Sequence, residues 1–155
     1  MSFRITGLDP APFRPLYGLD DAALAARGAR RCIADARPGY PDRIELRDAE
    51  PGERLILLNY LHQPANTPYR SSHAIFVREG AETRCDLIDA IPTALAIRPI
   101  SLRAFDNDGE MKDARLIDGD DLKLAIEAML EHEATAYLHA HYATRGCYAA
   151  RVDRA

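Results

Sequence analysis

Short apolar runs separated by glycine- and proline-containing turns fill most of the chain and predict β-strands. The most apolar run, residues 54–62, contains Leu55-Ile56-Leu57-Leu58 and has the composition of a central strand. Residues 43–47 alternate apolar and charged side chains, and the turn signal Glu50-Pro51-Gly52-Glu53 joins both runs into an expected β-hairpin. The other expected strands cover residues 3–6, 31–34, 73–78, 100–106, 111–117, 135–142 and 147–153.

Two segments carry the signals of helices. Residues 20–28 begin with aspartates suited to cap a helix, continue through an alanine-rich stretch and end in glycine. Beyond Asp118 and Asp120, apolar residues recur at helical spacing and form a stripe that would face a core. The stripe consists of Leu122, Ile126, Met129 and Leu130. Residues 80–98 are interrupted by proline, so we expect a loop there, with a helical turn at most.

The order of these elements predicts an α+β fold. Hairpins dominate, and the turn Asn107-Asp108-Gly109 of a second hairpin supplies a glycine for a positive φ. Only one long helix is present to serve a parallel crossover between strands. We therefore expect a curved, mainly antiparallel sheet of about eight strands, with one short N-terminal helix and one longer helix in the C-terminal half.

Length and composition indicate an ordinary globular protein. The 155 residues fit one domain, so we expect residues 1–155 to fold as a single unit. A hydrophobic content of 47% and a charged content of 28% argue against disorder. The net charge is −4 and the basic residues are spread along the chain, which argues against a nucleic-acid partner.

The chain carries the signals of a cytoplasmic protein. Residues 1–16 contain charges and prolines and no apolar signal-peptide core. The longest aliphatic run is far too short to cross a membrane, so we expect no membrane partner. Cys32, Cys85 and Cys147 are odd in number and far apart, which suits a reducing compartment better than a disulfide framework. The absence of a CxxC pair excludes a zinc ribbon and a thioredoxin motif.

Polar side chains gather on one face of several expected strands, because alternate residues of a strand share a face. In residues 135–142, one face carries Tyr137, His139 and His141, and the other carries small apolar side chains. The same rule groups polar residues elsewhere: Ser101 with Arg103, Tyr60 with His62, and Cys147 with Arg151. If the last two strands pair as a hairpin, the cysteine and arginine of the last strand come close to the two histidines.

The histidines suggest a transition-metal cofactor. The HxH step of His139 and His141 lets two imidazoles of one strand reach the same ion. Imidazole suits zinc, iron, nickel and copper. The candidate ligands are His62, His73, His139 and His141. No local spacing fixes a third ligand, so a solvated polar sheet face is the alternative interpretation.

The arginines suggest a pocket for a small anionic molecule. Guanidinium groups bind phosphate and carboxylate through paired hydrogen bonds, and the turn Thr144-Arg145-Gly146 adds backbone N–H groups. The expected ligand-binding residues are Tyr69, Arg70, Arg103, His141, Arg145, Cys147 and Arg151. Surface ion pairs with the 24 acidic residues are the alternative. No GxGxxG motif and no P-loop occurs, so the chain has no glycine-rich nucleotide cradle.

Three classes of function fit these residues. An enzyme would bind an anion through Arg103 and Arg145 and use His73 or His139 as general acid or base. Cys147 beside a histidine also suits a thiol nucleophile, although a buried, inert cysteine is more common. A non-catalytic binding or regulatory module would use the polar sheet face for a ligand or a protein partner. In a structural domain, this polar face would only be exposed to solvent. An antiparallel sheet with exposed edges also favours a homodimer.

A combination of segments extends over nearly the whole chain and is specific. The segments are Pro38-Gly39-Tyr40-Pro41, Leu46 to Glu53, Tyr69-Arg70 with His73 to Val77, Ser101 to Asp106, and Arg145 to Arg151. Together they resemble a bacterial family catalogued as domain of unknown function 1203. The resemblance implies a stand-alone bacterial domain. It implies no activity, because the name of the family records none.

Overall fold

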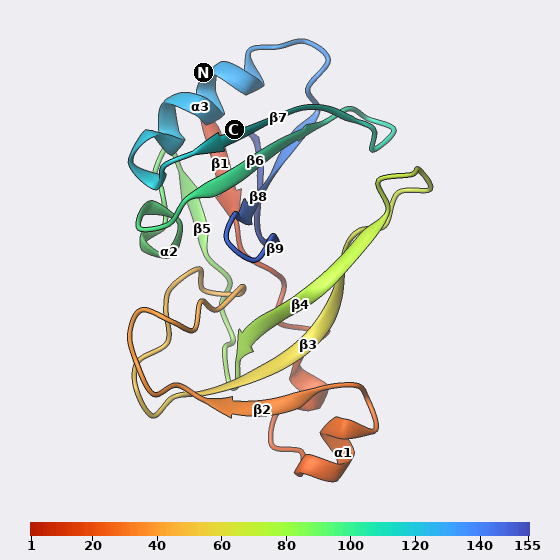
Figure 1. The fold of residues 1–155 in the computed structure, drawn as a ribbon, viewed down its shortest axis with the longest axis vertical. Helices are drawn as coiled ribbons and strands as arrows, with labels where there is room; N and C mark the ends of the chain where they lie inside the picture. The colour runs from red at the N-terminus through yellow and green to blue at the C-terminus, as the bar shows by residue number, and fades with distance from the viewer.

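The computed structural model describes all 155 residues and folds them into two antiparallel sheets with three α-helices. The larger sheet consists, in spatial order, of β5 (Asp86–Ile88), β1 (Phe3–Thr6), β9 (Cys147–Arg154), β8 (Tyr137–Tyr142), β6 (Ile100–Phe105) and β7 (Met111–Ile117). The smaller sheet consists of β2 (Arg30–Ile33), β3 (Arg54–Gln63) and β4 (Ser71–Arg78). Figure 1 shows the larger sheet in the upper half of the molecule and the smaller sheet in the lower half.

The helices form where their sequence signals are strongest. Asp20 caps α1 (Asp21–Ala25) by accepting a hydrogen bond from the backbone N–H of Ala23 at 2.8 Å. The apolar stripe of α3 (Leu122–Leu130) is buried as expected. A further short helix, α2 (Thr93–Ala96), lies in the segment expected to be a loop, and two 3₁₀ turns, η1 (Arg14–Leu16) and η2 (Gly119–Asp121), complete the set. None of these helices has both the length and the apolar character needed to cross a membrane.

The α+β class is confirmed, but the expectation of one curved sheet is wrong. The predicted hairpin of residues 43–62 does not form, and β3 pairs with β2 and β4 instead. The carboxylate of Asp42 accepts the backbone N–H groups of Ile44 and Glu45 at 3.2 and 2.6 Å, which bends the chain into a turn. Leu46 then takes a positive φ of 53°, which no regular strand allows. Ile44 and Leu46, whose alternation with charged residues suggested a strand, belong to this turn and are buried in the core.

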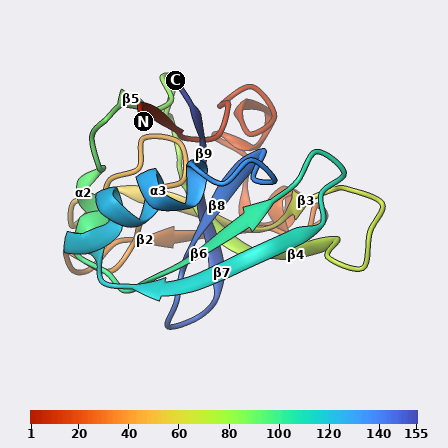
Figure 2. The ribbon, with the colours of Figure 1, turned by 90° about the horizontal axis from the view of Figure 1, so that it is seen from above.

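One face of the larger sheet forms the main core with α3. Leu138 and Ala140 of β8 and Leu102 of β6 pack there, and each is fully buried. Seen from above, α2 and α3 lie together on one side of this sheet (Figure 2). Because side chains of a strand alternate, the odd-numbered residues of β8 point the other way, toward the smaller sheet.

Arg43 joins the two sheets. Its side chain is only 2% exposed, and its Nε donates a hydrogen bond to the carbonyl of Tyr148 in β9 at 2.8 Å. The terminal nitrogens donate to the carbonyl of Pro41 at 2.6 Å and to the sulfur of Cys147 at 3.0 Å. Tyr148 itself packs among the buried residues of the smaller sheet. The space between the two sheets is therefore bounded by well-fixed side chains.

Candidate functional site

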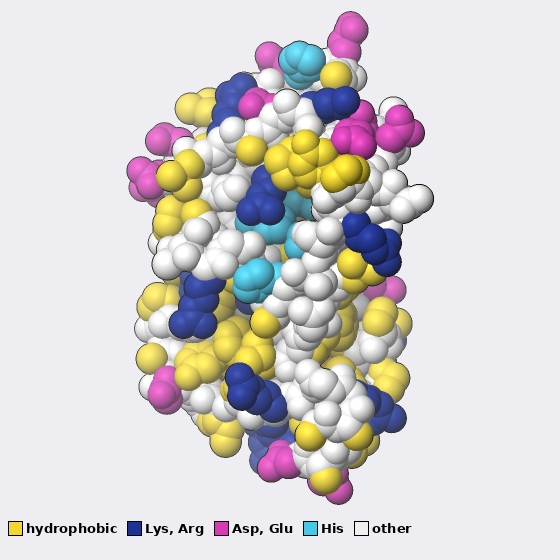
Figure 3. Space-filling model, turned by 45° about the vertical axis from the view of Figure 1, so that its right-hand side comes forward, with side chains coloured by type: hydrophobic (Ala, Val, Ile, Leu, Met, Phe, Trp, Pro, Cys, Tyr) yellow, Lys and Arg dark blue, Asp and Glu magenta, His cyan; other side chains and the backbone are white.

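Three histidines from the two sheets converge between them. His62 comes from β3, and His139 and His141 come from β8. One ring nitrogen of each lies within 4.8 Å of one from each of the others, and no ring is more than 9% exposed. Figure 3 shows histidine side chains and a basic side chain gathered in a hollow near the middle of this face.

A β-bulge brings His62 into this group. The β3–β4 ladder shifts between Leu61 and Gln63, so His62 is an extra residue on its strand. A bulge bends a strand and redirects a side chain, and bulges are over-represented beside functional sites. The β8–β9 ladder also shifts, between Ala140 and His141. The extra residue in this second ladder is Ala149 of β9, so one bulge lies on the strand of His62 and the other on the neighbour of the strand that carries His139 and His141.

The shift in the second ladder places Tyr148 opposite His141. The ring of Tyr148 stacks on His62, with centroids 5.6 Å apart and planes 8° apart. It meets His139 and His141 edge-on, at 5.2 and 5.8 Å. This aromatic ring packs against all three imidazoles and restricts their rotation.

In His141 and His62, one ring nitrogen forms a hydrogen bond that orients the ring; we call it the outer nitrogen. The Nδ1 of His141 donates to the carbonyl of Gly146 at 2.9 Å, which leaves its Nε2 as a lone-pair donor. The Nε2 of His62 lies 2.9 Å from the hydroxyl of Ser71. The Nδ1 atoms of His62 and His139 and the Nε2 of His141 are buried without a hydrogen-bond partner. Metal-bound histidines have this arrangement, with the outer nitrogen held by a carbonyl or hydroxyl group.

The three imidazoles are neutral at pH 7. Burial lowers the pKa of His62 to about 4 and the pKa values of His139 and His141 to about 3. The positive charge of Arg103 acts in the same direction on each ring. Neutral imidazole is the form that binds a metal ion, so no proton has to leave these rings first.

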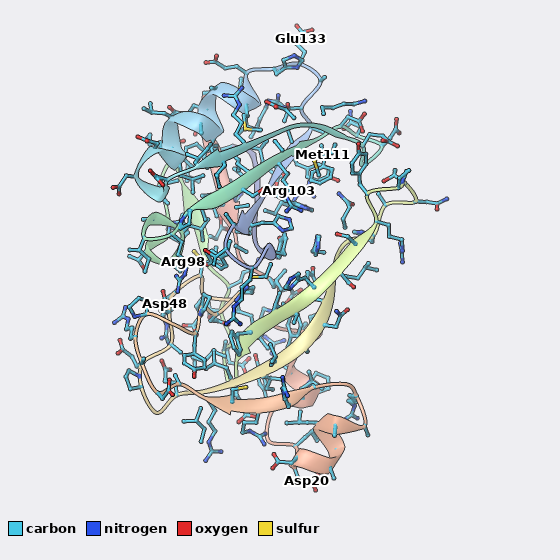
Figure 4. The ribbon with its side chains drawn as sticks, viewed as in Figure 1. Asp20, Asp48, Arg98, Arg103, Met111 and Glu133 are labelled. Carbon is cyan, nitrogen blue, oxygen red and sulfur yellow. The ribbon has the colours of Figure 1, made fainter.

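Arg103 provides an unpaired positive charge beside the histidines. It lies directly opposite His139 in the β6–β8 ladder, and Figure 4 shows its side chain reaching from β6 into the space between the sheets. Its guanidinium donates one side-chain hydrogen bond, to the hydroxyl of Ser101 at 3.2 Å, and has no carboxylate partner. Burial lowers its pKa. An arginine in this state has donors to offer to an anion.

A pocket of about 310 Å³ opens onto two of the histidines. His62, His139 and Arg151 line it together with the β6–β7 turn. Arg151 is already paired with Asp153 at 2.8 Å, and its guanidinium lies 4.0 Å from the ring centroid of Tyr137. Arg151 is therefore already engaged by a carboxylate and a ring, whereas Arg103, which lies beside His139 and does not line this pocket, is the basic group without a partner.

The geometry of the histidines suits a metal ion with open coordination positions. Zinc–nitrogen bonds are about 2.0–2.1 Å long, which places the nitrogens of a tetrahedral site about 3.3 Å apart. From separations within 4.8 Å, each ring closes this distance by moving less than about 1 Å. Three protein ligands then leave a position for water or another ligand.

The structure unites three of the four candidate metal ligands. His73 stays outside the group: its side chain is half-buried, and its ring nitrogens lie 2.9 and 3.2 Å from the carbonyls of Ala74 and Arg145. It lines a second, larger cavity instead.

The expected anion-binding residues divide among three places. Arg103, His141 and Arg151 lie at the three-histidine site, and Arg145 and Cys147 line the larger cavity. Tyr69 and Arg70 line neither pocket and belong to the exposed loop after β3.

Cys147 does not meet His139, contrary to the expected grouping on one face. The register shift pairs Cys147 with Tyr142, and its sulfur accepts a hydrogen bond from Arg43. The parity rule assumes an unbroken ladder, and the bulge breaks it. Sequence reasoning also missed Tyr148 and Ser71 as partners of the histidines, because no local signal marks either bulge.

Comparison with protein families gives a match over most of the chain. A family model described as Protein of unknown function (DUF1203) matches residues 39–154. The matched region contains the three histidines and Arg103. No curated protein and no solved structure matches the chain.

Proposed function

The chain belongs to the DUF1203 family of proteins of unknown function, and we propose that it binds a divalent transition-metal ion through His62, His139 and His141 and presents this ion to a small anionic ligand. The observation that carries the proposal is the set of buried ring nitrogens, one from each histidine, that have no partner in the protein. A buried polar group left unpaired costs about 1–3 kcal/mol. One shared ion gives all of these nitrogens a partner at once.

The donor set favours a particular class of ion. Neutral imidazoles suit zinc, copper, iron and nickel, whereas magnesium and calcium prefer oxygen ligands. Gly146 and Ser71 hold two of the rings through their outer nitrogens and so preserve the ligand geometry. When bound, such an ion acts as a Lewis acid toward water or toward a ligand oxygen.

The charge at the site favours an anionic ligand. No carboxylate belongs to the group of three histidines, so the protein ligands would not neutralise a divalent ion; Asp108 of the β6–β7 turn is the one carboxylate that lines the adjoining pocket. Arg103 adds a second positive charge without a carboxylate partner. A carboxylate or phosphate bound to the ion and to this guanidinium balances both charges. A concave pocket of about 310 Å³ also favours a small molecule over a protein partner.

Metal content measures the proposal directly. Untagged protein is dialysed against zinc, freed of excess ion and subjected to elemental analysis. We expect one zinc ion per chain in the wild type and none in His139→Ala/His141→Ala. His132→Ala provides the matched control, because His132 is exposed and lies outside the group.

The single variant His62→Ala removes the proposed ligand on the smaller sheet, and it keeps the test valid if the double variant does not fold. We expect it to lower zinc affinity by about 10- to 100-fold or more with an unchanged circular dichroism spectrum. Equal zinc content in the wild type and in both folded variants would contradict the proposal.

A further inference from the structure

The larger of the two cavities described, about 720 Å³, has mostly basic residues among its charged lining residues. Its basic lining residues are Arg30, Arg43, Arg98, Arg145 and His73, against a single acidic one, Asp35. Arg98 is paired with Asp48 at 2.8 Å, and Figure 4 shows these two residues close together. The other three arginines have no carboxylate partner. The cavity therefore carries an excess of positive charge.

Arg43 is the most deeply placed of these cations. Its hydrogen bonds end on two backbone carbonyls and one sulfur, so no anion balances its charge. A buried cation without a counter-ion is costly, and an anion bound in the cavity reduces that cost.

Tyr142 gives an independent indication that the cavity suits an anion. The guanidinium groups of Arg43 and Arg98 each lie 5.0 Å from the centroid of its ring. The side chain is 5% exposed, and its hydroxyl is buried without a hydrogen-bond partner. Burial raises the pKa of Tyr142 to about 12, so the hydroxyl keeps its proton as a donor at pH 7. A hydroxyl donor on a ring that contacts two cations suits an anionic acceptor.

Aromatic and aliphatic side chains form another part of the cavity wall. Tyr40 and Phe76 form an aromatic pair with ring centroids 5.4 Å apart, and Leu57 and Ile75 line the cavity beside them. Such a surface takes the flat apolar part of a ligand. The cavity volume lies within the range of small-molecule sites, which is about 300–1,000 Å³.

We propose that this cavity is a second ligand site, and that it binds an organic oxyanion with an aromatic body. The hydroxyl of Tyr142 and the guanidinium groups of Arg43 and Arg145 bind the carboxylate or phosphate group. Tyr40 and Phe76 contact the aromatic body. The site uses none of the three histidines, so it stands independently of the metal proposal.

Isothermal titration calorimetry on chelator-treated protein tests this site, with benzoate and phenyl phosphate as separate probes. We expect one-to-one binding of at least one of them, and the stronger one identifies the oxyanion. Benzyl alcohol, which has the aromatic body without the charge, should not bind.

Tyr142→Phe is the decisive variant, because the hydroxyl that it removes bonds to nothing in the protein. We expect an unchanged or higher melting temperature together with about tenfold weaker anion binding. Arg145→Gln should weaken binding about tenfold as well, whereas Arg27→Gln, an exposed arginine outside the cavity, should leave it unchanged. No binding of either probe at millimolar concentration, or equal binding by Tyr142→Phe and the wild type, would overturn the proposal.

Discussion

Arg103 is the residue whose environment most affects the proposed ligand chemistry. It shares a sheet face with His139 and its guanidinium has no carboxylate within reach. Sequence parity placed His139 and His141 on one face of their strand and Arg103 with Ser101 on one face of another; the pairing of β6 with β8, which brings Arg103 beside His139, comes from the structure. Parity did not identify the missing counter-ion, because ion pairing depends on the whole surroundings of the side chain.

Replacing Arg103 should separate ligand binding from metal binding. In cobalt-loaded protein, azide binding is followed through the visible absorption of the ion. We predict that Arg103→Gln weakens azide binding about tenfold through the loss of a charged donor, with cobalt affinity unchanged or increased. Arg115→Gln, on exposed β7, is the control. Azide binding at wild-type strength in Arg103→Gln would show that the guanidinium does not contact the ligand.

Glu53 determines part of the acid stability. Two hydrogen bonds from Arg47, at 2.8 and 3.0 Å, lower the pKa of Glu53 from its usual 4.5 to about 2. The folded state therefore binds this proton less readily than the unfolded chain, so the stabilisation is complete above about pH 4.5 and is lost as the pH falls toward 2.

We predict that Glu53→Gln lowers the free energy of unfolding by about 1–2 kcal/mol at pH 7. The difference from the wild type should shrink steadily as the pH falls below 4.5 and approach a minimum near pH 2. Urea denaturation at several pH values measures it. If the difference in the free energy of unfolding between Glu53→Gln and the wild type did not change with pH, the charge of Glu53 would not contribute to stability through Arg47.

At the scale of elements, the site depends on irregularities in the strands. The alternating pattern predicted β8 and the shared face of its histidines. It did not predict the bulge at His62, because one extra residue in a ladder leaves no mark in a hydrophobic pattern. The turn around Leu46 was missed for a related reason: a buried turn can show the same alternation as a strand.

The β6–β7 turn at the mouth of the histidine pocket admits only glycine at its tip. Gly109 has a φ of +81°, and an added Cβ would lie 2.4 Å from the Cβ of Ala65. Gly52 is a matched control, with a φ of +92° and nothing within 4 Å of an added Cβ. We predict a loss of about 1–2 kcal/mol for Gly52→Ala.

Gly109→Ala should lower the free energy of unfolding by about 1–3 kcal/mol more than Gly52→Ala does, because the added methyl also clashes with Ala65. Chemical denaturation of both variants provides the measurement. Equal losses would mean that the loop after β3 moves aside easily, and that the mouth of the pocket is not fixed.

At the scale of the whole molecule, the sequence predicted the fold class but not the division into two sheets. The connection that defines the division is long-range: the carboxylate of Asp42 accepts the backbone N–H of Arg78 at 2.7 Å, and Arg43 reaches β9. Local patterns contain no information about such contacts. Local patterns also could not show that the expected anion-binding residues belong to different pockets. Arg145 and Cys147 line the larger cavity and do not line the histidine pocket.

Because several contacts join the two sheets, among them the hydrogen bonds of Arg43 and the packing of Tyr148 against the smaller sheet, we predict that residues 1–155 unfold in one cooperative transition. Arg43→Met should lower its stability by about 3 kcal/mol without splitting the transition, since the carbonyls of Pro41 and Tyr148 lose their donors. Differential scanning calorimetry checks this through the agreement of calorimetric and van't Hoff enthalpies. Two resolved transitions in the wild type would show that the sheets fold separately.

The central claim, that His62, His139 and His141 share a metal ion, is tested most directly by anomalous diffraction. Crystals of the zinc-loaded protein are measured on both sides of the zinc absorption edge. We predict one strong anomalous peak between β3 and β8, about 2.0–2.1 Å from one ring nitrogen of each histidine. An anomalous map with no peak at these three rings, or with zinc bound only elsewhere on the protein, would contradict the account.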